Sequence, residues 1–168
     1  QWVKSLRPEG ERDVAPGGGV AVSGGRVYAA TAYRQVAALD AGSGQVLWTA
    51  DLSTPARGAP AVGQGHVFIV TQSNEVIALK LEDGSQAWSY QGIEEIGGIL
   101  SAADPAIAGN QVVVPFSSGE VMSLDIKTGE PQWADGVTRG FRTQALSGLA
   151  DVSASPVISG DTVYATGV

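Results

Sequence analysis

The chain has 168 residues, of which 43% are hydrophobic and 16% charged, and its formal net charge is −7. An acidic chain repels phosphate backbones, which argues against nucleic-acid binding, and the lack of cysteine excludes disulfides, cysteine-ligated zinc and a thiol nucleophile within these residues. No run approaches the roughly 18 apolar residues of a membrane helix, whereas 23 glycines and 8 prolines suit short strands joined by tight turns.

The N-terminal letters QWVKSL, residues 1–6, alternate like a strand and carry a tryptophan. They resemble the end of a repeat whose complete copies follow. The glycine-rich stretch PGGGVAV at 16–22 is not followed by Lys-Ser/Thr or by a helix signal, so it does not predict a phosphate-binding loop.

Three segments then align without a gap, at residues 20–48, 60–88 and 105–133, and a fourth copy begins at Pro156. In the first copy, strand signals fall at about 20–22, 26–31, 35–40 and 46–51. Glycine-centred turns such as SGG and GQG separate the first two strands of each copy. Four short strands per unit of about 40 residues are typical of a propeller blade, whereas a plain β-sandwich would not repeat its letters at fixed offsets.

The sequence therefore predicts an all-β β-propeller with four-stranded antiparallel blades. The expected blade bodies are about 20–51, 60–91 and 105–136, with partial blades at 1–6 and 156–168 in one partial propeller domain spanning 1–168.

One tryptophan closes each complete copy: Trp48, Trp88 and Trp133. On the outer strand, a large flat ring fits the gap between neighbouring blades, because an aromatic side chain buries on the order of 150–250 Å². We expect these three residues to dock blades rather than to act in catalysis.

Connector length varies although body length does not. From the tryptophan of one copy to the proline at or beside the start of the next copy (Pro60, Pro105 or Pro156), the chain runs 12, 17 and 23 positions. Packing fixes the bodies, while loops tolerate insertion and carry binding. The longer connectors, 91–104 and 135–155, combine apolar residues with charges, which is typical of a protein-binding patch. The alternative is that these side chains cap the blade ends.

Catalytic chemistry is not indicated. His66 is the single histidine and starts a strand after a turn. Asp40 and Asp125 recur at one position, which Lys80 fills in the second copy, and are expected to be turn residues. No nucleophile, base and orienting partner assemble, and no metal or cofactor site is predicted.

The motifs ALDAGSGQVLW and SLDIKTGEPQW resemble the A-x-D-x-x-T-G-x-x-x-W motif of pyrroloquinoline-quinone-type propeller repeats. The longer order through YQGIEE, VVVPFSSGE and the L-x-D-V segment before Pro156 resembles the BamB family of outer-membrane assembly lipoproteins in its alphaproteobacterial form. The resemblance runs from about residue 14 to 168.

That resemblance implies an eight-bladed propeller on the periplasmic face of the outer membrane, held there by an N-terminal lipid anchor. It implies a non-catalytic scaffold that contacts the periplasmic domains of BamA, the central barrel subunit. The family's partner surface maps here to five connector residues: Ile99, Leu100, Leu149, Asp151 and Ser153. Some members have arginine at the position of Leu100 and an acidic residue at that of Ser153.

Two alternatives share the blade motif. One is a quinoprotein dehydrogenase that holds its cofactor with Ca²⁺, and the other is a sensor propeller fused to a further domain. We also expect the chain to be a piece of a longer protein, with the lipid-anchor cysteine, signal peptide and remaining blades outside it.

Overall fold

The computed structural model describes residues 1–11, 17–93, 103–137, 152 and 154–166, and its described part contains strands and no helix. Three four-stranded antiparallel sheets follow one another, here called blades 1, 2 and 3, and a two-stranded hairpin follows them. Blade 1 contains β1 (Gly18–Ser23), β2 (Arg26–Thr31), β3 (Gln35–Asp40) and β4 (Val46–Asp51). Blade 2 contains β5 (Ala61–Gly63), β6 (His66–Val70), β7 (Glu75–Lys80) and β8 (Gln86–Gln91).

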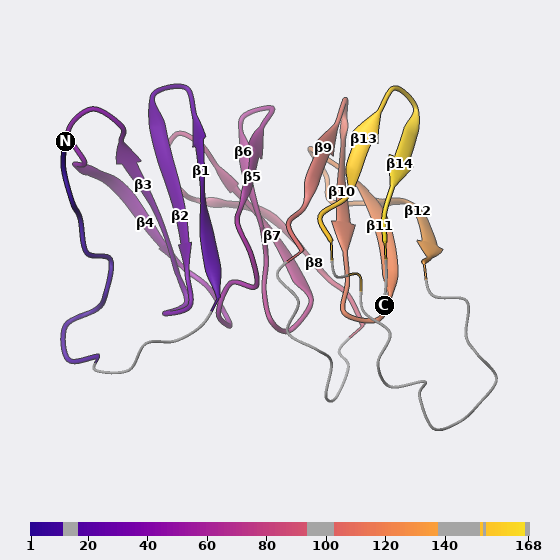
Figure 1. Cartoon of the computed structure of the whole chain (residues 1–168), viewed down its shortest axis with the longest axis horizontal. Coiled ribbons are helices and arrows are strands. Elements are labelled where there is room, and N and C mark those ends of the chain that lie inside the picture. The colour runs from indigo at the N-terminus through magenta and orange to yellow at the C-terminus, as the bar shows by residue number, and fades with distance from the viewer. Residues whose placement is uncertain (12–16, 94–102, 138–151, 153, 167–168) are drawn as a thin grey trace.

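Blade 3 contains β9 (Ala106–Ala108), β10 (Gln111–Pro115), β11 (Glu120–Asp125) and β12 (Pro131–Gly136), and the hairpin contains β13 (Val157–Ser159) and β14 (Thr162–Tyr164). In every sheet the strands are hydrogen-bonded in chain order. The first strands β1, β5, β9 and β13 are neighbours in turn, so the sheets stand side by side in an arc (Figure 1). The predicted four-stranded blade of a β-propeller is confirmed.

Turn chemistry agrees with the glycine-centred signals in the sequence. The first turn of each sheet contains residues with positive φ, such as Gly24 at 56° and Gly65 at 81°. Glycine adopts this region without a Cβ clash. The second turn also needs it, but there Arg34 (59°) and Asn74 (58°) adopt it without being glycine.

In blade 1 the second, third and fourth strands have the expected bounds, but the first begins two residues earlier than expected, at Gly18. Gly18 pairs with Thr31 and Gly19 with Ala30. A Cβ on Gly18 would lie 2.2 Å from the carbonyl oxygen of Ala30, and one on Gly19 would lie 2.7 Å from the Cβ of Ala59. The glycine run therefore allows β1 to approach its neighbours closely.

The hydrophobic core lies between the sheets. One cluster joins blade 1 to blade 2 and includes Val36, Ile69 and Trp48; a second joins blade 2 to blade 3 and includes Phe68 and Phe116. Two smaller clusters cover the remaining faces: Trp2 and Leu6 pack on blade 1, and Val152 with the β13–β14 hairpin packs on blade 3. Each sheet is thus stabilised mainly by its neighbours, as in other repeat architectures. The described residues include no helix long and apolar enough to cross a membrane.

Candidate functional site

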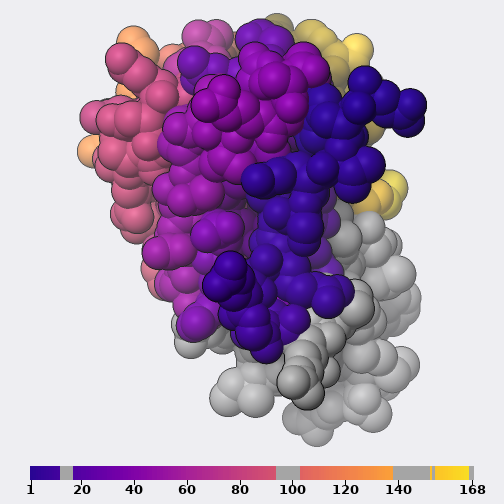
Figure 2. Space-filling view, turned by 90° about the vertical axis from the view of Figure 1, so that its left-hand side faces the viewer, coloured from indigo at the N-terminus to yellow at the C-terminus, as the bar shows by residue number. Residues whose placement is uncertain are grey.

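An indole group links each blade to the next through the same contacts. Trp48 on β4 donates its Nε1–H to the carbonyl of Leu81 at 3.1 Å, and Trp88 on β8 donates to Ile126 at 3.1 Å. Trp2 does the same for blade 1, donating to Ala41 at 2.9 Å. Figure 2 shows the N-terminal segment, in indigo, against blade 1.

A glycine receives each ring. Gly84 has a φ of 73°, and a Cβ added there would lie 2.5 Å from Cε3 of Trp48. Gly44 faces Trp2 and Gly129 faces Trp88 in the same way. Both Gly44 and Gly129 also have positive φ, so both the backbone conformation and the space for the ring require glycine.

A β-bulge sets the direction of each ring. Ala38 pairs with Trp48 but Leu39 pairs with Val46, so β4 contains one extra residue. The same shift occurs beside Trp88 and Trp133. A bulge bends the strand and re-aims the neighbouring side chain.

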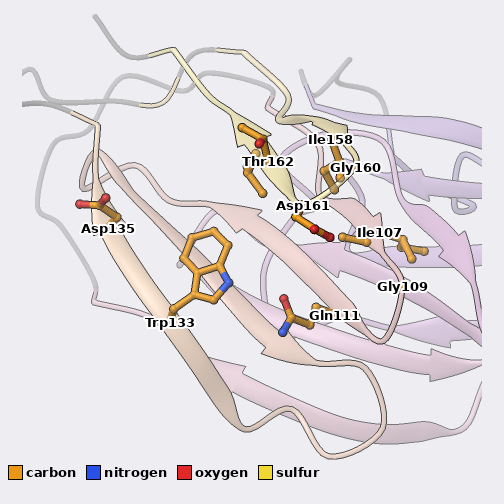
Figure 3. A pocket seen from close by; sticks show the side chains of 11 residues that line it. Ile107, Gly109, Gln111, Trp133, Asp135, Ile158, Gly160, Asp161 and Thr162 are labelled. Carbon is orange, nitrogen blue, oxygen red and sulfur yellow. The ribbon is translucent and has the colours of Figure 1, made fainter.

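Trp133 differs from its two counterparts. Trp48 and Trp88 are each 9% exposed, whereas Trp133 is 38% exposed. Among the described residues, the sheet after it contains only β13 and β14. It therefore lacks the turn between a third and a fourth strand whose glycine contacts Trp48 from blade 2 and Trp88 from blade 3. Its indole faces a groove of about 790 Å³ between β12 and the β13–β14 hairpin, lined also by Gln111 and Asp161 (Figure 3).

The recurring aspartates close the last turn of each blade. The Ser43 hydroxyl and N–H both donate to Oδ1 of Asp40 at 2.7 Å, and these bonds hold the pKa of Asp40 below its ordinary value. In blade 3, the N–H of Lys127 followed by that of Thr128 lowers the pKa of Asp125. The expectation that both are turn residues agrees with these contacts.

Blade 2 has Lys80 at this position and uses Asp83 instead. The Ser85 N–H donates to Asp83 Oδ1 at 2.9 Å and the Ser85 hydroxyl at 2.7 Å, which lowers the pKa of Asp83. The same turn is therefore stabilised from a different position.

The edge of the arc from which the connectors leave the blades is here called the connector edge. A buried polar network at this edge was not predicted from the sequence. Arg57 is 5% exposed, and its Nη1 lies 3.4 Å from Oδ1 of Asn74. The Asn74 amide donates to the carbonyl of Ile93 at 2.8 Å and to the hydroxyl of Ser117 at 2.7 Å. Asn74, in the second turn of blade 2, thereby fixes the start of the second connector (91–104) against blade 3.

The residues just before the first strands β5, β9 and β13 form a second hydrogen-bonded link between neighbouring blades. The N–H of Ala59 donates to Asp104 Oδ1 at 2.6 Å, and the N–H of Asp104 donates to the Ser155 hydroxyl at 2.9 Å. These three residues precede Pro60, Pro105 and Pro156. Their equivalent spacing is the signal by which sequence reasoning could have found them.

Both longer connectors are thus fixed at their described ends. The second connector (91–104) is held at Gly92, whose N–H donates to the carbonyl of Asn74, and at its other end by the buried Ala103 and by Asp104. The third connector (135–155) is held at Val137, whose N–H donates to the carbonyl of Gly119, and includes the buried Val152. These ends lie at the edge of the arc opposite the first turns of the blades (Figure 1).

The five predicted partner-binding residues lie outside the described residues: Ile99, Leu100, Leu149, Asp151 and Ser153. His66 is half-buried, with Nδ1 3.0 Å from the carbonyl oxygen of Gln64 and its ring packed against Phe68. Within the described ranges, no group of three or more His, Cys, Asp or Glu side chains could hold a metal ion.

The geometry defines a class: a β-propeller whose blades dock by an outer-strand tryptophan on the turn glycine of the next blade. Residues 1–168 match the family model described as outer membrane protein assembly factor BamB, and the chain belongs to that family. Proteins named outer membrane protein assembly factor BamB from Nitrosomonas eutropha and Yersinia pestis are 27% and 28% identical to it, each over 88% of the chain. The chain spans 36% and 38% of their lengths.

Solved structures show the same fold. The crystal structure of BamB from Moraxella catarrhalis superposes with a TM-score of 0.79 at 23% identity, over 86% of this chain and 44% of that one. A quinohemoprotein alcohol dehydrogenase from Comamonas testosteroni superposes with a TM-score of 0.71 at 17% identity, over 93% of this chain and 29% of that one. At these identities the likeness concerns the fold alone, and the blade is shared by both kinds of protein.

Proposed function

We propose that this chain is part of a non-catalytic scaffold of outer-membrane β-barrel assembly, acting at the periplasmic face of the outer membrane in a lipid-anchored, eight-bladed protein. The observation that carries the proposal is the match of all 168 residues to the BamB family model. The relatives named after this assembly role match over most of the chain.

The proposed binding surface is the connector edge, and the proposed partner is the periplasmic part of BamA. Ile99 and Leu100 supply the apolar contact in the second connector, and Leu149, Asp151 and Ser153 act from the third. Fixed connector ends support this assignment, because a rigid framework that presents loops is the usual arrangement of a binding site. Apolar residues rimmed by charge suit a protein partner.

The dehydrogenase alternative has the fold in its favour and nothing more specific. Its solved examples resemble the chain at 17–23% identity, whereas the match to the assembly-factor family covers the whole chain. Dye-linked alcohol oxidation by the full-length protein would overturn the scaffold proposal.

The proposal is tested by capture of the purified periplasmic domains of BamA on the immobilised full-length protein. Replacing both Ile99 and Leu100 with Asp, or Asp151 with Arg, is expected to weaken capture without changing the circular dichroism spectrum. The matched control is Leu47→Asp, because Leu47 is an exposed apolar residue in β4. Capture that is equal in wild type and both connector variants would remove these residues from the site.

A further inference from the structure

We propose that a pocket at the boundary of blades 2 and 3 receives an arginine side chain of the partner protein; this rests on the proposed function and names one contact of it. The pocket, here called the Ile93 pocket, has a volume of about 400 Å³. Its lining comes from the start of the second connector, the second turn of blade 3 and the end of β12: Ile93, Ser118, Gly119, Glu120, Ala134, Asp135 and Gly136.

The repeat contains an internal reference for this pocket. At the boundary of blades 1 and 2, the equivalent residues form hydrogen bonds with one another. The Ser53 hydroxyl donates to the Glu75 carboxylate, and the Ser73 hydroxyl lies 3.0 Å from that of Thr54. The Gln91 amide donates to the carbonyl of Ser73 at 2.8 Å. The space is therefore filled by the chain's own polar groups.

At the boundary of blades 2 and 3, two of those groups are absent, and the counterpart of Thr54 is Glu94, which lies outside the described residues. Ile93 stands in place of Ser53, and Gly136 stands in place of Gln91. The Ser118 hydroxyl, equivalent to that of Ser73, is buried without a hydrogen-bond partner in the described part of the chain. The pocket therefore lacks the polar side chains of Ser53 and Gln91 that occupy the equivalent place between blades 1 and 2.

Ile93 is presented on a fixed backbone. Its carbonyl accepts a hydrogen bond from the Asn74 amide, and Asn74 is 1% exposed. The Ile93 side chain is nevertheless 67% exposed. An aliphatic side chain that is exposed on a rigid backbone is suited to contact the aliphatic stem of a partner side chain.

The charge of the lining selects the occupant. Glu120 and Asp135 contribute carboxylates, and none of the seven described lining residues is basic. One oxygen of Asp135 already accepts the N–H of Gly136 at 2.8 Å, so Glu120 is the main acceptor. Arginine combines an aliphatic stem with five donors on a planar, weakly hydrated cation, which matches the Glu120 carboxylate and the Ile93 side chain together.

The test is an NMR titration of the chain with the peptide acetyl-Ala-Leu-Arg-Ala-amide, with the same peptide carrying citrulline as the neutral control. We expect the arginine peptide to shift the amide signals of Ser118, Gly119 and Gly136, and the citrulline peptide to shift them much less. Glu120→Gln is expected to raise Kd about two- to fivefold, the range for one exposed charge contact. Glu75→Gln, at the boundary of blades 1 and 2, is the matched control and leaves Kd unchanged.

A second variant, here called the filled variant, places in the Ile93 pocket the two polar side chains that occupy the equivalent place between blades 1 and 2. A Cβ on Gly136 would meet nothing within 4 Å, so Ile93→Ser with Gly136→Gln is expected to fold and to abolish the shifts. Equal shifts with both peptides, or an unchanged Kd in Glu120→Gln and in the filled variant, would overturn the inference. So would shifts as large with a lysine peptide, because the pocket would then select charge alone.

Capture separates this inference from the proposed function. If wild type and the filled variant capture the periplasmic domains of BamA equally, the pocket is not a contact although the scaffold function stands. If wild type captures nothing, the proposed function itself fails.

Discussion

At the scale of single residues, the glycines that receive the tryptophans carry the tightest requirement. Gly84 combines a positive φ with a ring 2.5 Å from the position of a Cβ, whereas Gly65 in the same blade has a φ of 81° and open space. The two positions therefore separate backbone strain from ring contact.

Gly84→Ala is expected to destabilise the chain by about 1–3 kcal/mol more than Gly65→Ala, because only the first forces the Trp48 ring to move. Urea unfolding followed by tryptophan fluorescence measures both changes in the free energy of unfolding. Equal losses would mean that the ring contact contributes nothing beyond the strained φ.

The turn aspartates give the chain a defined dependence on acid. Hydrogen bonds led by the Lys127 N–H lower the folded-state pKa of Asp125 from 3.8. A depressed carboxyl pKa contributes stability that is present above the unfolded pKa and is lost as the pH falls through the folded pKa. Asp125→Ala is therefore expected to lower the urea midpoint at pH 7, and the gap from wild type is expected to narrow as the pH falls below 3.8. A gap that stays constant with pH would contradict this role of the carboxylate.

At the scale of elements, the sequence predicted what recurs. The strand positions, the first turns and the tryptophan of each blade follow from letters at fixed offsets, since each blade meets the same neighbour in the same way. The sequence did not reveal the Asn74 and Arg57 network or the Ile93 pocket. Both arise where one repeat departs from another, and their partners become visible only when two blades are placed side by side.

The same packing makes the tryptophans unequal. Trp88 is buried between two complete blades and donates to Ile126, whereas Trp133 borders an open groove. Trp88→Ala is expected to cost about 3–5 kcal/mol, the usual range for truncating a buried large aromatic residue, and Trp133→Ala is expected to cost clearly less in this chain. Urea unfolding of the two variants measures the difference. A Trp133→Ala loss as large as that of Trp88→Ala would show that the ring is buried in solution.

At the scale of the whole molecule, stability is expected to fall toward the hairpin that follows blade 3. Each sheet depends on its neighbours, so a sheet between two others is held from both sides. Strands β6 and β10 are almost entirely buried, whereas β13 and β14 are mostly exposed. Local opening free energies follow burial and contact density.

Hydrogen exchange measured by mass spectrometry is expected to show the slowest exchange in peptides covering β6, β7, β10 and β11. Peptides covering β13 and β14 are expected to exchange fastest among the strands, with β1 to β4 between, because Trp2 and Leu6 cover the outer face of blade 1.

Removing Trp2 by Trp2→Ala is expected to speed exchange in blade 1 and to leave blade 3 unchanged, since the ring contacts only the first of these sheets. Uniform exchange across all three blades, with a uniform response to Trp2→Ala, would mean that the arc opens as one cooperative unit rather than blade by blade.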